Sequence, residues 1–325
     1  DEYLEQELQD GEDVMEWLNN QPWCDGNVGM IGKSWGGFNG LQMAYRRPPQ
    51  LKAVVSVCST DDRYADDVHY MGGCLLGDNL SWASVMFALN SLPPDPEIAR
   101  DQWRDMWFNR LEGSGLWLET WLQHQHRDDF WKHGSVCENF SRMDTPTLAV
   151  SGWADGYSNS VFRLLAHLPG PKMGLIGPWS HKYPHSGEPG PAIGFLQECV
   201  RWWDYWLKGI DNGIMEEPML RTWMQEAMPP SAQYEHRPGR WIAEDKWPSE
   251  NVHYQWRTLT PWELSNPEEP SQEVHEMDIK SPLSVGLFAG KWCSYQAPPD
   301  LPHDQRQEDG GALTFDSDLL QEPLE

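Results

Sequence analysis

The segment Gly32-Lys33-Ser34-Trp35-Gly36 fits the pattern Gly-x-Ser-x-Gly, which can hold a nucleophilic serine. An apolar run at 27–31 precedes it and a helical pattern at 37–46 follows it, so the motif falls at a turn from a buried strand into a helix. Such a turn is strained, needs small residues and lifts the serine hydroxyl above the sheet. We therefore predict that Ser34 is a nucleophile and that the backbone N–H of Trp35 stabilises an oxyanion. A glycine-rich turn with an incidental serine is the alternative.

A serine hydroxyl becomes nucleophilic when a histidine takes its proton and a carboxylate orients that histidine. Where the nucleophile follows a strand in this way, the chain order is serine, then acid, then histidine. Asp155 follows the apolar run 147–151 and is the expected acid. Asp144 precedes that run and would lie at the opposite end of the sheet. A plain loop-capping role for Asp155 is the alternative.

The histidine is expected after the next strand of the sheet. Residues 172–176 form another apolar run, and His181 follows it within Gly-Pro-Trp-Ser-His. Topology therefore favours His181 as the general base, with His185 as the second choice. His167 falls inside a helical pattern and is expected to be structural. With the serine and the acid, the base would transfer an acyl group to water through an acyl-enzyme.

A second group of polar side chains was considered as a metal site. It consists of His124, His126, His133, Asp128 and Asp129. Positions two apart on a helix do not share a face, and this stretch has a helical pattern, so we predict no metal site here. The acyl-transfer chemistry itself needs no metal and no other cofactor.

Apolar runs alternate with helical patterns around these motifs, which is typical of a parallel sheet covered by helices. We therefore expect an α/β fold with a sheet of the α/β-hydrolase type. The predicted strands are 27–31, 51–58, 147–151 and 172–176, and the predicted helices are 3–19, 37–46, 161–167 and 191–208.

Two further regions lack this alternation. Residues 61–140 are expected to form a helical cap, and residues 216–325 an all-β domain, either a sandwich or a jelly roll. The remaining parts, 1–60 and 141–213, would form the hydrolase domain. The helical stretches of the cap are near 79–90, 95–111 and 116–132, and the alternating runs of the β domain include 220–224, 252–256 and 312–315.

The composition limits the partners that this chain can have. Its net charge of −26 opposes binding to nucleic acids and to anionic membrane surfaces. No apolar run of membrane-spanning length is present. The six cysteines form no Cys-x-x-Cys pair, which favours free thiols and a cytoplasmic location. The expected partner is a small ester, amide or peptide substrate, and a homo-oligomer stays an option.

Four segments together resemble the CocE/NonD family of hydrolases, which includes cocaine esterase, α-amino-acid ester hydrolases and X-Pro dipeptidyl-peptidases. They are DVMEWLNNQPWCDGNVGMIGKSWGG around Ser34, SGWADGY around Asp155, GPWSH at His181, and RWWDYWLKGIDNG. A weaker match is RWIAEDKWP at 240–248. The resemblance implies an α/β-hydrolase domain, a helical cap at about 61–140 and a C-terminal jelly roll from about 216.

The resemblance also bears on the ends of the chain. Family members carry sheet strands before the nucleophile strand, and a tyrosine there helps to form the oxyanion hole. Only 26 residues precede the predicted strand at 27–31. A chain shortened at both ends, with the N-terminal strands missing, is therefore expected. Expressed alone, it would be aggregation-prone and nearly inactive.

Substrate contacts follow from the same resemblance. Asp66 and Asp67 lie near the place of a cap carboxylate that binds the substrate ammonium group in amino-acid ester hydrolases. Tyr157 stands where another such carboxylate is implied, which disfavours that activity. We expect these three residues, together with Trp153 and Trp179, to contact substrate. The function expected is a serine hydrolase of carboxylic esters or amides, with an X-Pro dipeptidyl-peptidase or a non-catalytic binding protein as alternatives.

Overall fold

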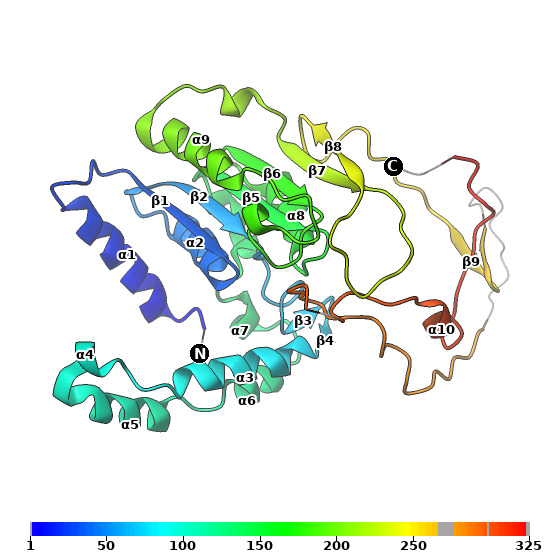
Figure 1. Cartoon of the computed structure of the whole chain (residues 1–325), viewed down its shortest axis with the longest axis horizontal. Helices are drawn as coiled ribbons and strands as arrows, with labels where there is room; N and C mark the ends of the chain where they lie inside the picture. Colours follow the sequence, from blue (N-terminus) through cyan, green and yellow to red (C-terminus); the bar gives the residue numbers. More distant parts are fainter. Residues whose placement is uncertain (1, 266–275, 298, 323–325) are drawn as a thin grey trace.

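The computed structural model describes residues 2–265, 276–297 and 299–322. A six-stranded sheet with the order β1-β2-β5-β6-β7-β8 forms its centre (Figure 1). The strands are β1 (Val28–Lys33), β2 (Leu51–Val57), β5 (Thr147–Gly152), β6 (Lys172–Gly177), β7 (Leu220–Gln225) and β8 (Gly239–Glu244). β1, β2, β5, β6 and β7 are parallel to one another, and β8 is antiparallel to β7. β1 lies at one edge of the described sheet and pairs with β2, so the other strands all lie on the β2 side of β1.

Helices cover both faces of the sheet, which explains why β2, β5 and β6 are apolar along almost their whole length. Helices α1, α2 and α8 pack on one face, and α9 packs on the other (Figure 1). Their bounds are α1 (Glu5–Asn19), α2 (Trp35–Arg46), α8 (Ser158–His167) and α9 (Phe195–Lys208). The four predicted strands and four predicted helices of this domain are all present.

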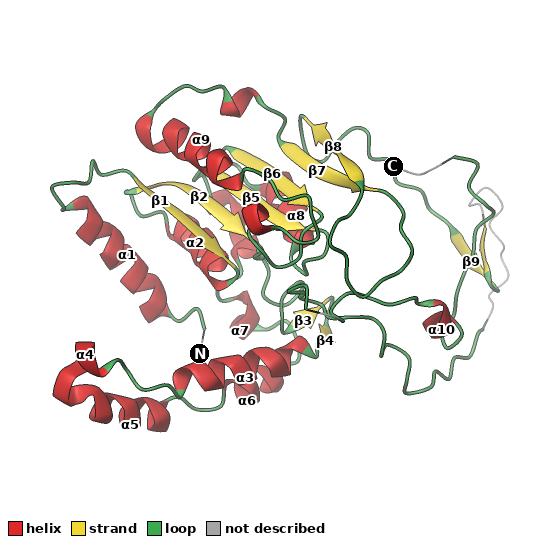
Figure 2. Ribbon diagram, viewed as in Figure 1, coloured by secondary structure: helices red, strands yellow, loops and turns green. Residues whose placement is uncertain are grey.

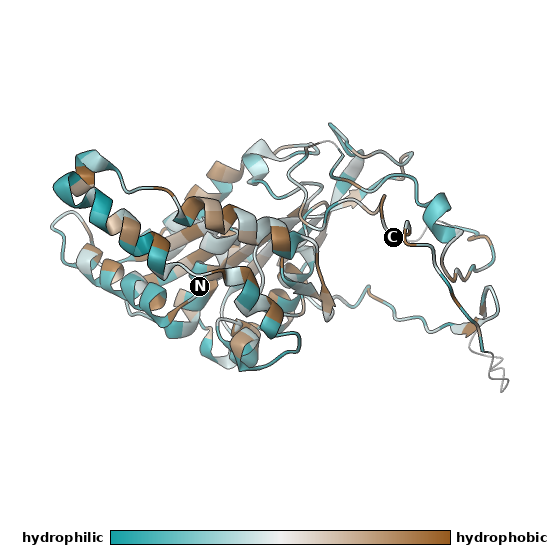
Figure 3. Cartoon of the chain, turned by 90° about the horizontal axis from the view of Figure 1, so that it is seen from below, coloured by the Kyte–Doolittle hydropathy of each residue, from teal (hydrophilic) through white to brown (hydrophobic). Residues whose placement is uncertain are grey.

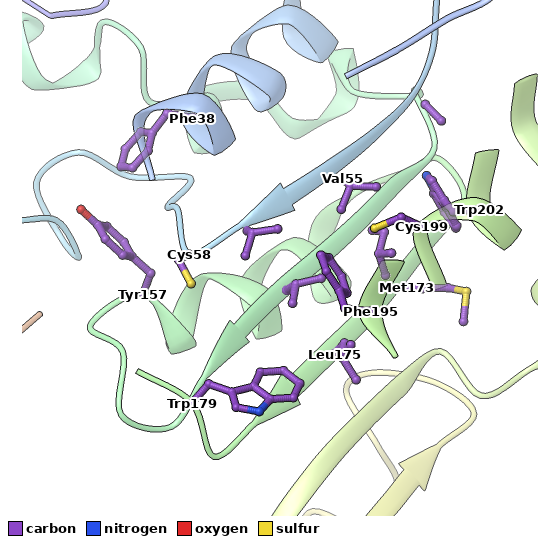
Figure 4. Packing of buried hydrophobic residues seen from close by; sticks show 14 of the residues in the cluster. Phe38, Val55, Cys58, Tyr157, Met173, Leu175, Trp179, Phe195, Cys199 and Trp202 are labelled. Atoms are coloured by element: carbon purple, nitrogen blue, oxygen red, sulfur yellow. The ribbon is translucent and has the colours of Figure 1, made fainter. Parts of the chain in front are cut away.

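Successive residues of β2 point to opposite faces and so enter different clusters. Val54 packs with the α1, α2 and α8 side, whereas Val55 packs with Phe195 and Trp202 of α9. Figure 4 shows the α9 side, in which Phe195 and Trp202 are fully buried. Truncating a buried aromatic residue such as Phe195 to alanine costs about 3–5 kcal/mol of stability.

The insertion between β2 and β5 is largely helical, as predicted. Its elements are β3 (Tyr70–Met71), β4 (Cys74–Leu75), α3 (Asp78–Asn90), α4 (Pro96–Ala99), α5 (Trp103–Gly113), α6 (Trp117–Gln123) and α7 (Asp129–Lys132). The predicted helices at 95–111 and 116–132 are each broken. Arg100 has a positive φ of 51°, and Asp128 accepts a hydrogen bond from the N–H of Phe130 and so caps a new helix.

The C-terminal part differs from the prediction. β7 covers the run 220–224, but β7 and β8 extend the hydrolase sheet, and no jelly roll is formed by the described residues. Runs 252–256 and 312–315 are not strands (Figure 2). Beyond β8 the described elements are β9 (Thr258–Thr260), β10 (Glu263–Ser265) and α10 (Arg306–Asp309). An alternating pattern predicts a strand but does not predict which strand it pairs with. In the structure, β7 pairs with β6.

Apolar side chains also reach the surface of the cap. On α3, Leu80 and Phe87 are about three-fifths exposed, at 61% and 59%. Figure 3 shows such apolar residues interspersed with polar ones along the helices. Within the described residues, no helix combines the length and the apolar character needed to cross a membrane.

Candidate active site

Ser34 lies at the sharp turn between β1 and α2. Its φ of 57° and ψ of −126° are unusual for a residue with a side chain, and such strain costs on the order of 1–3 kcal/mol. The turn is fixed by hydrogen bonds: the Ser34 N–H donates to the Val57 carbonyl at 2.9 Å, and the Ser34 carbonyl accepts from the N–H of Gly37 at 2.8 Å. A Cβ atom on Gly32 would lie 2.2 Å from the backbone of Gly36. The glycines of the motif therefore permit the close packing that the turn needs.

Trp35 is the first residue of α2, so its N–H has no carbonyl partner within the helix. The positive end of the helix dipole lies at the same place and favours a developing negative charge. The Trp35 side chain is held apart from this N–H, because its indole donates to Glu7 at 2.6 Å. The backbone N–H is thus available as an oxyanion donor.

Asp155 and His181 form a buried pair. His181 Nδ1 lies 3.0 Å from Asp155 Oδ1, and the Ser151 hydroxyl donates to Asp155 Oδ2 at 2.8 Å. Burial raises the pKa of Asp155, but the charge and hydrogen bond of His181 and hydrogen bonds from Cys58 and Ser151 outweigh it, so the pKa lies below its ordinary value. An ionised Asp155 fixes the proton of His181 on Nδ1, which leaves Nε2 free to accept a proton.

The backbone of His181 is also anchored. Its N–H donates to the Ser294 carbonyl at 2.9 Å, and its carbonyl accepts from Lys33 Nζ at 3.1 Å. The ring packs edge-on against Tyr295, with centroids 5.2 Å apart. Among the described residues, no hydrogen bond joins Ser34 to His181. Catalytic hydrogen bonds are often long in a site without substrate and tighten when substrate binds.

A small cavity adjoins Ser34. Its volume is about 20 Å³, so it holds about one water molecule. Residues from both ends of the chain and from the cap enclose it: Glu2, Tyr3, Ser34, Trp35, Phe38, Asp67, Val68, Trp82, Tyr157, Cys293 and Tyr295. A substrate can therefore enter only when some of these side chains move.

Two buried carboxylates line this cavity, and Glu2 is the one with many partners. It lies 3.5 Å from Arg63 Nη2 and 3.0 Å from His69 Nε2, and it accepts from the indole of Trp82 at 2.9 Å. Burial raises the pKa of Glu2, but His69 and Arg63 lower it to about 2. Burial likewise lowers the pKa of His69, but Glu2 raises it above its ordinary value. The Glu2 carboxylate is therefore already paired with side chains of the protein.

Asp67 has a spare acceptor. Its Oδ1 accepts from the hydroxyl of Tyr157 at 2.9 Å and from the N–H of Val68 at 2.7 Å, whereas its buried Oδ2 has no hydrogen-bond partner. Burial raises the pKa of Asp67 to about 6. The imidazole of His69 lies beside this oxygen, with Nε2 3.9 Å from Asp67 Oδ2, so Oδ2 has an ion-pair partner but can still accept a hydrogen bond from a second cationic group.

The remaining residues predicted as substrate contacts lie elsewhere. Asp66 is buried against Arg163, with Oδ2 and Nη1 3.0 Å apart, and does not line the cavity. Trp179 is buried in the core, where its indole donates to the Pro191 carbonyl (Figure 4). Trp153 is partly exposed and lines a different cavity, which Asp155 also lines and Ser34 does not. Of the five predicted contacts, Asp67 and Tyr157 reach the Ser34 cavity.

The histidines of the cap do not converge on one point. His124 Nδ1 lies 2.6 Å from Asp128 Oδ2, whereas His133 Nε2 lies 2.5 Å from the Tyr3 carbonyl. His185 is exposed and stacks on Tyr183. These surroundings do not support His185 as the general base.

Several residues of the site have no signal in the sequence. Glu2, Tyr3, Cys293 and Tyr295 reach the cavity through contacts between distant parts of the chain. Cys58 is different, because it directly follows β2 and so lies at the same end of the sheet as the triad. Its place after an apolar run could have indicated a position beside the site.

Comparisons with known proteins agree with this arrangement. Residues 2–183 match the family model described as X-Pro dipeptidyl-peptidase (S15 family), and residues 212–325 match the X-Pro dipeptidyl-peptidase C-terminal non-catalytic domain. The cocaine esterase of Rhodococcus sp. is 28% identical over 53% of this chain and 34% of its own length. A candidate Xaa-Pro dipeptidyl-peptidase of Bacillus cereus is 22% identical over 68% of this chain and 40% of its own. The chain thus spans well under half of the length of these two relatives.

Solved structures show the same fold. A CocE/NonD family hydrolase from Staphylococcus aureus superposes with a TM-score of 0.63 and 21% identity, covering 82% of this chain and 43% of that one. An aminopeptidase from a thaumarchaeon gives 0.57 and 20%, covering 93% and 51%. The fold is that of the α/β-hydrolase class, as the alternation of strands and helices predicted. By its sheet, its motifs and the match over residues 2–183, the chain belongs to the S15 family of X-Pro dipeptidyl-peptidases.

Proposed function

We propose that this chain is a serine hydrolase that cleaves carboxylic esters or amides through an acyl-enzyme on Ser34. The observation that carries the proposal is the buried Asp155–His181 pair at the sheet end where the strained turn presents Ser34. Family membership and the esterase and peptidase names of the relatives support it.

The mechanism follows from the geometry of these groups. His181 Nε2 takes the proton of Ser34 as the hydroxyl oxygen attacks the substrate carbonyl carbon. Asp155 stabilises the imidazolium that forms, and the Trp35 N–H donates to the oxyanion. His181 then protonates the leaving group, and a water molecule, activated by the same base, hydrolyses the acyl-enzyme.

The nucleophile is tested by Ser34→Ala. We expect the hydrolysis of p-nitrophenyl acetate to fall by about 10⁴-fold or more, because the acyl-enzyme cannot form. A fluorophosphonate probe, which reacts only with an activated serine, should label the parent chain and leave the variant unlabelled. Labelling that survives the substitution would assign another nucleophile, and an unlabelled parent chain would favour a non-catalytic binding protein.

The substrate is proposed to carry a protonated amine near the scissile carbonyl. Supporting observations are that Asp67 Oδ2 accepts no hydrogen bond, with His69 Nε2 3.9 Å away, and that Asp67 lines the same small cavity as Ser34. A free N-terminus, as in an X-Pro dipeptide unit, provides such a charge, whereas a simple ester does not. This favours X-Pro dipeptidyl-peptidase activity as the second candidate function.

Asp67→Asn separates these two candidates. For Ala-Pro-p-nitroanilide we expect the KM to rise by about tenfold, the loss of one charge-assisted contact, whereas p-nitrophenyl acetate should be little affected. Asp66→Asn is the matched control, because Asp66 is equally buried but pairs with Arg163. Equal effects of Asp67→Asn on both substrates would exclude an ammonium contact.

A further inference from the structure

A thiol lies beside the triad and takes part in no step of the mechanism above, although its hydrogen bond helps to lower the pKa of Asp155. Cys58 follows β2, Asp155 follows β5 and His181 follows β6, so the carboxyl ends of three adjacent strands bring them together. One potential ligand atom from each of the three lies within 4.8 Å of the other two, and all three residues are buried. Among the described residues, this is the one group of three histidine, cysteine or acidic side chains that converges in this way.

We propose that Cys58, Asp155 and His181 bind a soft divalent cation such as Zn²⁺, and that this binding switches the hydrolase off. A thiolate, an imidazole and a carboxylate form a ligand set that favours Zn²⁺ over Mg²⁺ or Ca²⁺. The inhibitory part of this inference rests on the proposed function, whereas cation binding does not.

The distances suit a tetrahedral ion. Zinc bonds of about 2.0–2.1 Å to nitrogen and oxygen place those two ligand atoms about 3.3 Å apart. The observed separation of His181 Nδ1 and Asp155 Oδ1 is 3.0 Å, so a shift of a few tenths of an ångström admits the ion. Zn–S bonds of about 2.3 Å place sulfur about 3.6 Å from the other two ligand atoms. The Cys58 thiol lies within 4.8 Å of them, so it becomes the third ligand after moving by up to about 1 Å, and water can take the fourth position.

Binding would prevent general-base catalysis by a simple proton rearrangement. In the active triad the proton of His181 is on Nδ1, and Nε2 accepts the proton of Ser34. A cation on Nδ1 replaces that proton, so the neutral ring carries its proton on Nε2 and cannot accept another. Cys58 also loses its thiol proton, and the net change is the release of one proton to solvent.

The first experiment measures inhibition. We expect ZnCl₂ to inhibit the hydrolysis of p-nitrophenyl acetate by the full chain, and EDTA to restore it. Cys58→Ser should raise the apparent inhibition constant at least about tenfold, since even outer-shell changes weaken metal sites by 10–100-fold. Each rate is compared with that of the same variant without zinc. Cys199→Ser is the matched control, because Cys199 is another buried thiol, on α9 and apart from Cys58 (Figure 4).

The second experiment measures binding without activity. Co²⁺ coordinated by a thiolate gives a charge-transfer absorption band, which we expect in the parent chain and in Cys199→Ser but not in Cys58→Ser. The absence of this band from the parent chain, or its persistence in Cys58→Ser, would overturn the site. A band that depends on Cys58 in a chain without hydrolase activity would keep the cation site and reject the proposed function.

Discussion

Three separate hydrogen bonds hold His181 in position. Asp155 holds its ring, Ser294 its N–H and Lys33 its carbonyl. Such support fixes the ring more tightly than a loop alone would. This matters because general-base catalysis requires the accepting nitrogen to lie within hydrogen-bond reach of the nucleophile.

We therefore expect His181→Ala to reduce kcat for p-nitrophenyl acetate on the order of 10⁴-fold, because the triad loses its base. His185→Ala is the control and should leave kcat within about twofold, since His185 is exposed and its ring contacts are with Tyr183 and Phe195, outside the triad. Single-turnover kinetics would separate the acylation step. The opposite ranking of the two variants would identify His185 as the base.

The pH dependence of substrate binding should depend on Asp67. Burial raises the pKa of Asp67 to about 6, so the carboxylate is charged above this pH and neutral below it. Attraction for a substrate ammonium group is therefore present above about pH 6 and lost as the pH falls through it. We expect KM for Ala-Pro-p-nitroanilide to rise on acidification below pH 6, whereas KM for a neutral p-nitrophenyl ester stays flat there. Parallel KM profiles for the two substrates would contradict this role.

At the scale of elements, the turn between β1 and α2 depends on the absence of a side chain at Gly32. A Cβ atom there would lie 2.2 Å from both the carbon and the oxygen of the Gly36 carbonyl, whereas a Cβ atom on Gly36 would meet nothing within 4 Å. The two glycines of one motif therefore form a natural pair for comparison.

Gly32→Ala should destabilise the fold by about 1–3 kcal/mol or more, because the strand and the helix must separate. Gly36→Ala should change the stability by less than about 1 kcal/mol, since it adds a side chain into open space at a helix start. Thermal or urea unfolding would measure both. Equal losses of stability would show that the close approach at Gly32 is not what limits this turn.

The elements also show how far the sequence predicts this molecule. The proposed triad positions follow from local patterns, because each of the three residues comes after an apolar strand and parallel strands end at one edge of a sheet. The pairing of β7 with β6 could not be predicted in this way, since alternation contains no information about partners. Trp179 was misjudged for a similar reason: its place after β6 is local, but its burial under Gly187 and Pro191 depends on a later loop.

At the scale of the whole molecule, the segment 292–295 closes the site from the C-terminal side. Trp292 packs on Tyr157 with ring centroids 4.9 Å apart, and Tyr295 packs on His181. These side chains belong to the region that matches the C-terminal domain of the family. That region therefore limits the space beside Ser34 although it supplies none of the triad.

Tyr295→Ala should enlarge the cavity beside Ser34. We expect the ratio of kcat/KM for p-nitrophenyl octanoate to kcat/KM for the acetate to rise by about tenfold or more. Each added methylene group contributes binding energy only where the cavity has room for it. The ratio is the useful measure, because the ring also contacts His181. An unchanged ratio would show that another side chain, such as Trp82 of the cap, limits the size of the acyl group.

The contacts of His181 with Ser294 and Tyr295 have a consequence for the synthesis of the protein. The strands that carry the triad are complete once residue 181 has left the ribosome, but the groups that anchor and enclose His181 lie more than a hundred residues later. The strands β1, β2, β5 and β6 can therefore form before the residues that anchor and enclose His181 have been synthesised.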